Sequence, residues 1–204
     1  MSLAIDTLTH RERLHVLGIA GSLRTGSVNR ALIAAARELA PPGVELEPYD
    51  LHGIPLFDED VEARGDPPEV VSLKAAISHA DALLLATPEY NGGTSAVLKN
   101  AIDWASRPYT DSVLAGKPVA IIGATPGRGG TAGAQEQLRV VIKRAGAEPI
   151  AQPEVLVAGA HDVLSSGALT DPALREQVMS LLAAVRHHAQ AARTATKRDR
   201  ARAA

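Results

Sequence analysis

Cysteine is absent from this sequence of 204 residues. Its absence excludes disulfide bonds, thiolate nucleophiles, and zinc or iron–sulfur sites held by cysteine. A chain without cysteine suits a reducing cytoplasm, and we expect this protein there. Aromatic residues are scarce as well: the sequence has three tyrosines, one tryptophan and one phenylalanine. We therefore expect a core built from alanine, valine, leucine and isoleucine.

The sequence also lacks an excess of either charge. Its 21 Lys and Arg residues stand against 23 Asp and Glu residues, so the formal net charge is −2. Because binding to nucleic acid or an anionic membrane relies on a basic surplus, we expect neither as a partner. No stretch approaches the ~18 consecutive apolar residues that span a bilayer. The seven histidines show no HExxH spacing, so we expect no metal site.

The two ends of the chain differ in composition from the part between them. Residues 1–13 lack the apolar stretch of a signal peptide and predict a flexible leader. Residues 191–204 are rich in Arg and Lys and predict a flexible, solvated basic tail. Residues 14–190 show no repeat and no linker, and their number suits a single domain.

Strand and helix patterns alternate along residues 14–190. Short apolar or alternating runs predict strands, and apolar residues at helical spacing predict helices. The expected strands are 14–20, 44–49, 81–87, 118–124 and one between 148 and 157; the expected helices are 27–40, 68–80 with Asp66 as cap, 94–106, 132–146 and one beginning at 170–172. This alternation predicts an α/β fold, a doubly wound five-stranded parallel sheet of flavodoxin-like order 2-1-3-4-5 with helices on both faces. A ligand then binds beyond the carboxyl ends of the first, third and fourth strands.

The loop after the first strand, residues 21–30, has the composition of a phosphate site. It leads into a helix N-terminus, where free N–H groups and the helix dipole favour anions. Ser22 and Ser27 add hydroxyls, Asn29 adds an amide and Arg24 adds a positive charge. The loop resembles a Walker A motif but lacks its lysine, so we expect a single phosphate. The alternative is an ordinary, well-capped turn.

The loops after the third and fourth strands are suited to a flat heterocycle. Residues 87–94 combine Pro88, Glu89 and Tyr90 with two glycines, which suits stacking and hydrogen bonding to a ring edge; the alternative is a tight structural loop. Residues 125–132 contain the pattern GxGxxA, which by itself is a weak dinucleotide signal on a fourth strand. We expect this loop to line the other side of the heterocycle and to offer Arg128 to an anionic cosubstrate.

The segments GSLRTGSVNR (residues 21–30) and PEYNGGTSAVLKNAIDW (residues 88–104) together resemble the NADPH-dependent FMN reductase family, over roughly residues 14–160. The resemblance implies FMN as cofactor, NADPH as cosubstrate with NADH also possible, and a homodimer or homotetramer with the helix 94–106 near the subunit contact. It implies that the FMN phosphate, ribityl chain and ring are held by Ser22, Arg24, Ser27, Val28, Asn29, Pro88, Glu89, Tyr90, Asn91, Gly92, Thr125 and Gly127.

The function that this resemblance implies is an NAD(P)H-dependent reductase. Hydride would pass through flavin N5 to a quinone or a similar acceptor, such as a flavin, an azo or nitro compound, or chromate, by a ping-pong mechanism. Since the flavin carries this chemistry, we assign no catalytic side chain. Two alternatives stay open: a flavodoxin-type FMN electron carrier without a pyridine-nucleotide step, and a scaffold that has lost its flavin. Electron carriers of this type usually have a strongly acidic surface, which a net charge of −2 does not provide. The intact first loop argues against the scaffold.

Overall fold

The computed structural model describes residues 13–165 and 168–203, so the predicted leader 1–13 lies outside it except for Arg13. A parallel sheet runs through the centre in the order β2-β1-β3-β4-β5, as predicted. Its strands are β1 (Leu14–Ala20), β2 (Val44–Tyr49), β3 (Ala82–Ala86), β4 (Pro118–Ala124) and β5 (Glu148–Pro149), with β6 (Val155–Val157) also paired to β4. This is the flavodoxin-like strand order.

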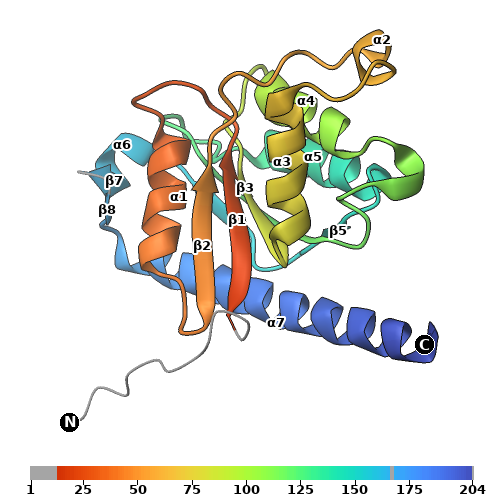
Figure 1. Cartoon of the computed structure of the whole chain (residues 1–204). Coiled ribbons are helices and arrows are strands. Elements are labelled where there is room, and N and C mark those ends of the chain that lie inside the picture. The colour runs from red at the N-terminus through yellow and green to blue at the C-terminus, as the bar shows by residue number, and fades with distance from the viewer. Residues whose placement is uncertain (1–12, 166–167, 204) are drawn as a thin grey trace.

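Helices cover both faces of the sheet, as Figure 1 shows. The helices α1 (Val28–Glu38) and α7 (Pro172–Ala203) lie on one face, and their apolar side chains form one core cluster with alternate residues of β1, β3 and β4. The helices α3 (Pro68–His79), α4 (Ala96–Ala105) and α5 (Ala132–Arg144) form a second cluster on the other face. Both clusters are almost entirely aliphatic, as the scarcity of aromatic residues requires.

The last strand differs from the prediction, because two short strands replace the single one expected between 148 and 157. Glu148 pairs with Pro118 at the start of β4, whereas Val155 pairs with Ile122 near its end. Neither Pro149, the last residue of β5, nor Pro153, which lies between the two strands, has an N–H to donate to a sheet ladder.

The start of α3 also differs from the prediction, because Asp66 does not cap this helix. Its carboxylate instead accepts a hydrogen bond from Lys74 Nζ at 2.6 Å. The carbonyl of Pro67, at the N-cap position, accepts the N–H groups of Val70 and Val71, each at 2.9 Å. The helix thus begins without a side-chain cap.

The long connection 50–67 between β2 and α3 has structure of its own. It contains the short helix α2 (Glu59–Glu62), which is capped by Asp58. Trp104 of α4 is fully buried and donates from Nε1 to the carbonyl of Pro55 at 2.8 Å. Asn100 donates to the same carbonyl at 2.8 Å and accepts the N–H of Phe57 at 2.8 Å. Trp104 is therefore an anchor for this connection.

The C-terminal segment 191–203, which lies in the predicted basic tail, is helical. Helix α7 continues to Ala203 across the amino ends of the strands (Figure 1). Ala189 is fully buried, and the Arg193 guanidinium lies 2.7 Å from a carboxylate oxygen of Asp81, just before β3. None of the helices in the described part of the chain is both long and apolar enough to cross a membrane.

The segment between β6 and α7 holds elements that the periodicity did not predict. They are the short helix α6 (Ala160–Val163) and the two-stranded hairpin of β7 (Leu164–Ser165) and β8 (Ala168–Leu169). A further short 3-10 turn, η1 (Tyr109–Asp111), follows α4. The hairpin strands contact α1, so this segment extends the α1 face of the molecule.

Candidate functional site

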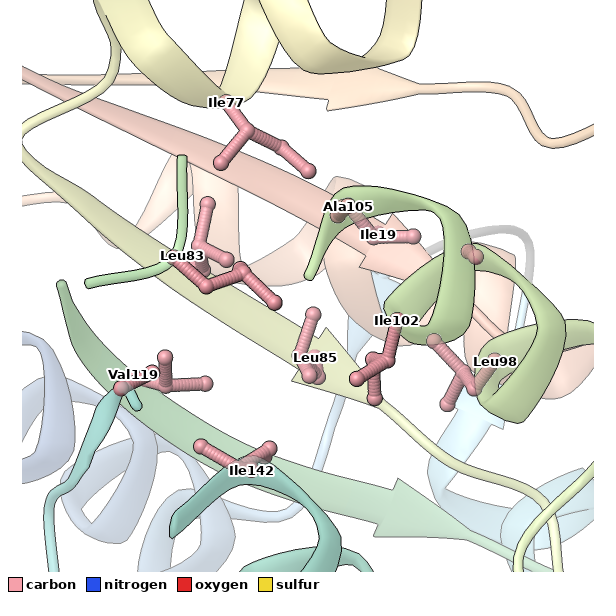
Figure 2. Close-up of a pocket in the computed structure, with 12 residues that line it drawn as sticks. Ile19, Ile77, Leu83, Leu85, Leu98, Ile102, Ala105, Val119 and Ile142 are labelled. Carbon is pink, nitrogen blue, oxygen red and sulfur yellow. The ribbon is translucent and has the colours of Figure 1, made fainter. Parts of the chain in front are cut away.

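An apolar gap lies between the sheet and the helices α4 and α5. Figure 2 shows that its labelled side chains come from both the strands and the helices and are all aliphatic, among them Leu85, Ile102 and Ile142. These residues belong to the buried cluster on that face. With no polar group in its lining, this gap cannot recognise a phosphate or a polar ring edge, and we assign it to core packing.

A polar cleft of about 430 Å³ lies at the carboxyl ends of β1, β3 and β4, where the strand order predicts a ligand site. It is lined by Ser22, Arg24, Gly26, Ser27, Val28, Asn29, Pro88, Glu89, Tyr90, Ala124, Thr125, Pro126 and His161. Nine of the twelve residues predicted to bind the cofactor thus lie on its wall; Asn91, Gly92 and Gly127 do not.

The first loop connects β1 to α1, and contacts at Gly21 and Ser27 fix its two ends. Gly21 donates to the carbonyl of Ala86 at 2.9 Å, and a Cβ at this position would come within 2.6 Å of the Ser95 hydroxyl, so only glycine fits. Ser27 caps α1 by accepting the Arg30 N–H at 3.3 Å. A hydroxyl that accepts this bond can still donate its own proton to a ligand. The N–H groups of the first helical turn have no intrahelical acceptor, so they too can donate hydrogen bonds to an anion.

Arg24 is the positive charge of this loop. Its side chain is exposed and, within residues 13–165 and 168–203, pairs with no carboxylate. The nearly buried hydroxyl-bearing residues Ser22 and Ser27 lie on the same wall. Two hydroxyls, helix N–H groups and a guanidinium form a donor set that matches a single phosphate group.

Asn29, which the sequence pattern places in the phosphate site, is bonded to the backbone of β4. Its amide nitrogen donates to the carbonyl of Ala124 at 2.9 Å, and its amide oxygen accepts the Ala124 N–H at 2.9 Å. The side chain is almost fully buried. It therefore joins the first turn of α1 to the end of β4 and holds the two sides of the cleft together.

The second loop is a tight hairpin that presents Tyr90. The backbone groups of Tyr90 and Gly93 bond to each other at 3.1 and 3.0 Å, and Asn91 and Gly92 both have positive φ, at 52° and 76°. Positive φ at both central residues is typical of a type I′ turn, for which Asn-Gly is the favoured pair. Asn91 and Gly92 thus shape the turn, while Tyr90 remains 52% exposed beside the cleft.

Glu89 links the second loop to α5. Its carboxylate accepts the Ala134 N–H at 3.0 Å, and Thr131, at the N-cap position of this helix, forms no side-chain cap. A carboxylate at a helix N-terminus is favoured by the helix dipole. Glu89 therefore fixes the second loop against the third, in addition to lining the cleft.

The third loop is joined to the segment that follows β6. Thr125 lines the cleft and its hydroxyl accepts the Gly127 N–H at 3.2 Å. The carbonyl of Gly127 accepts the N–H of Gly159 at 3.1 Å. Gly127 therefore supports the loop instead of forming the cleft wall.

His161 is the lining residue with side-chain chemistry that sequence reasoning missed. A signal was present, because Gly159 and His161 follow a strand that ends at the same edge of the sheet as β1, β3 and β4. We had expected the last strand without assigning any role to the residues after it.

Known proteins resemble this chain in both sequence and fold. The family model for NADPH-dependent FMN reductase matches residues 14–162. An NAD(P)H-dependent FMN reductase of Pseudomonas aeruginosa is 48% identical over 173 residues, which cover 84% of this chain and 93% of that protein. A 2-hydroxy-1,4-benzoquinone reductase of a Burkholderia species is 44% identical over 145 residues, which cover 71% of this chain and 78% of that protein.

A solved structure extends this likeness to three dimensions. The flavoenzyme FerB of Paracoccus denitrificans, an NAD(P)H:(acceptor) oxidoreductase, superposes with a TM-score of 0.78 at 33% identity, covering 86% of this chain and 98% of that one. The donor set around Ser22, Arg24 and Ser27 fits the phosphate of FMN, and the exposed Tyr90 suits its ring. The chain therefore belongs to the NADPH-dependent FMN reductase family and is an oxidoreductase that uses FMN and NAD(P)H.

Proposed function

We propose that this protein reduces quinones and similar small acceptors by a ping-pong mechanism in which NAD(P)H and the acceptor use one cleft in turn. The observation that carries the proposal is the convergence of three loops on a single open cleft whose donor set suits one mononucleotide phosphate. When bound there, FMN supplies hydride chemistry, and the chain binds and orients it. The 2-hydroxy-1,4-benzoquinone reductase among its relatives supports a quinone as acceptor.

Nine of the twelve predicted contacts have a task of their own in this proposal. Arg24, the hydroxyls of Ser22 and Ser27, and the N–H groups at the start of α1 bind the phosphate. Pro88, Tyr90 and Thr125 contact the ribityl chain and ring, with Asn91, Gly92 and Gly127 acting through the backbone of their turns. Arg128, exposed on the third loop, is open to the phosphates of the pyridine nucleotide, and together with Arg24 it favours NADPH over NADH by charge.

Anaerobic mixing of the purified protein with NADPH separates the reductase from its alternatives. We expect rapid loss of the visible flavin absorption and its return when a quinone is added. A flavin-loaded protein that keeps its absorption would be an electron carrier, and a protein that binds no FMN would be a scaffold. Initial rates with NADPH and NADH against a series of quinones then test the mechanism, since ping-pong kinetics gives parallel double-reciprocal lines.

We also propose that the chain forms a homodimer or homotetramer through the side of α4. Leu56 and Tyr109, which are 80% and 72% exposed, flank the C-terminal end of this helix. Pro55 is bonded to Trp104, and the Arg107 guanidinium stacks 3.8 Å from the centre of the Tyr109 ring. Sedimentation of the wild type and of Leu56→Asp tests the proposal, because a charge at this surface should shift the population toward monomer.

A further inference from the structure

The cleft has a fourth side, formed by the segment that follows β6. His161, in the short helix α6, lines the cleft together with Arg24, Ser27 and Thr125. We propose that the His161 imidazole donates a hydrogen bond to the phosphate of bound FMN and, with Arg24, makes the site select FMN over the unphosphorylated flavin. The inference rests on the proposed function and names one more residue of the same site.

The backbone that carries His161 is held firmly although its side chain is exposed. The N–H of Ala160 donates to the carbonyl of Thr125 at 3.0 Å, and the N–H of Gly159 donates to the carbonyl of Gly127 at 3.1 Å. Ala160 itself is fully buried in the core cluster on the α1 face. His161 is thus fixed to the third loop, so little backbone ordering is needed when a ligand arrives.

The position of α6 indicates which end of the ligand His161 meets. The hairpin that follows α6 contacts α1, and its residues Leu164 and Leu169 share a buried cluster with Leu32 of α1. Figure 1 shows α6 beside the N-terminal end of α1 and away from α4 and α5. Glu89, by contrast, is bonded to α5 and marks the opposite end of the cleft. His161 therefore belongs to the end where the first loop and the α1 N-terminus receive the phosphate.

The imidazole is free to serve as a donor. In the part of the chain that the structure describes, His161 makes no hydrogen bond or ion pair, and neither does the Arg24 side chain. The charged groups around it are Arg24 and Glu89 on the cleft and the neighbouring Asp162. A phosphate is the ligand group in this site with enough acceptor oxygens to satisfy both Arg24 and His161, and such charge-assisted bonds are among the strong ones.

The test compares FMN with riboflavin, which has the same ring but no phosphate. Dissociation constants of the flavin-free protein are measured by quenching of flavin fluorescence for the wild type, His161→Ala, His161→Gln and, as matched control, His187→Ala on the exposed side of α7. We expect His161→Ala to weaken FMN binding roughly tenfold and riboflavin binding little. His161→Gln keeps a donor and should recover part of the loss, while His187→Ala should match the wild type.

Three results would contradict the inference. Equal loss of FMN and riboflavin in His161→Ala would place the imidazole against the ring. An unchanged FMN affinity in this variant, with circular dichroism showing a folded protein, would remove His161 from the site and leave the proposed function standing. A wild-type protein that binds no FMN would overturn the proposed function as well.

Discussion

The polar side chains around the cleft fall into two groups according to what they bond within the protein. Asn29 and Glu89 are bonded to backbone groups of β4 and α5. Arg24 and His161 have no such partner in the described part of the chain, and Tyr90 is half exposed. The first group sets the shape of the cleft and the second is available to ligands. A sequence motif lists both groups together, because it carries no information on which side chains are already bonded.

Asn29→Ala tests this division at a single residue. The change leaves the N–H and the carbonyl of Ala124 without their partner, and buried unsatisfied groups cost ~1–3 kcal/mol each. We expect the free energy of unfolding to fall by about 2–4 kcal/mol, measured by denaturant titration. Gln190→Ala, which removes an exposed amide on α7, should change it by less than ~0.5 kcal/mol. If Asn29→Ala were as stable as this control, Asn29 would be a ligand contact only.

Asp50 gives the protein a small dependence of stability on pH. The hydrogen bond from the His52 ring is the main cause that holds the Asp50 pKa below its ordinary value, helped by the His52 N–H and the charge of Arg30. A carboxylate with a lowered folded-state pKa stabilises the protein above its unfolded value of 3.8 and loses this effect as the pH falls through the folded value.

We therefore expect Asp50→Asn to be less stable than the wild type at about pH 6 and equally stable in strong acid. The difference should stay below ~1 kcal/mol, because solvent screens a half-exposed carboxylate. Urea unfolding across this pH range measures it, with the exposed Asp111→Asn as control. If the free energy of unfolding of the variant differed from that of the wild type by the same amount at every pH, the Asp50 charge would make no contribution to stability.

At the scale of elements, hydrophobic periodicity was sufficient for most of the fold. Strands such as 118–124 and the apolar stripe of α1 at Leu32, Ile33 and Ala36 carry their pattern in the sequence itself. The elements that were missed depend on contacts between distant residues. The C-terminal half of α7 is stabilised by Asp81, over a hundred positions earlier, and α6 is too short to show a period.

Arg193 tests why the last turns of α7 are helical. In Arg193→Ala the Asp81 carboxylate, with a side chain only 13% exposed, keeps its bond to the His15 N–H but loses the ion pair with Arg193. We expect a loss of about 1–2 kcal/mol in the free energy of unfolding and faster amide hydrogen exchange over residues 186–198. The control is Arg198→Ala, which removes an exposed guanidinium five residues further on. Equal exchange in the two variants would mean that the ion pair does not hold the helix.

At the scale of the whole molecule, the two faces of the sheet have different tasks. The α1 face supplies the wall formed by the first loop and, through His161 of α6, the fourth side of the cleft. The other face supplies α5, to which Glu89 fixes the second loop. Since β1 and β3 are neighbours and the chain leaves them toward opposite faces, a ligand at their carboxyl ends touches both layers.

Because the ligand joins both layers, FMN should stabilise the whole molecule against heat. A ligand that binds only the folded state at about 100 times its dissociation constant adds ~2.7 kcal/mol. For a protein of this size that corresponds to a rise in Tm of roughly 5–10 °C, measured by calorimetry on the flavin-free protein. Riboflavin at the same concentration should give a smaller rise, and Arg24→Ala should reduce the FMN effect toward the riboflavin value, since both changes remove the pairing of guanidinium and phosphate. If Arg24→Ala kept the full rise with FMN, the phosphate would lie away from the first loop, and our orientation of the cofactor in the cleft would be wrong.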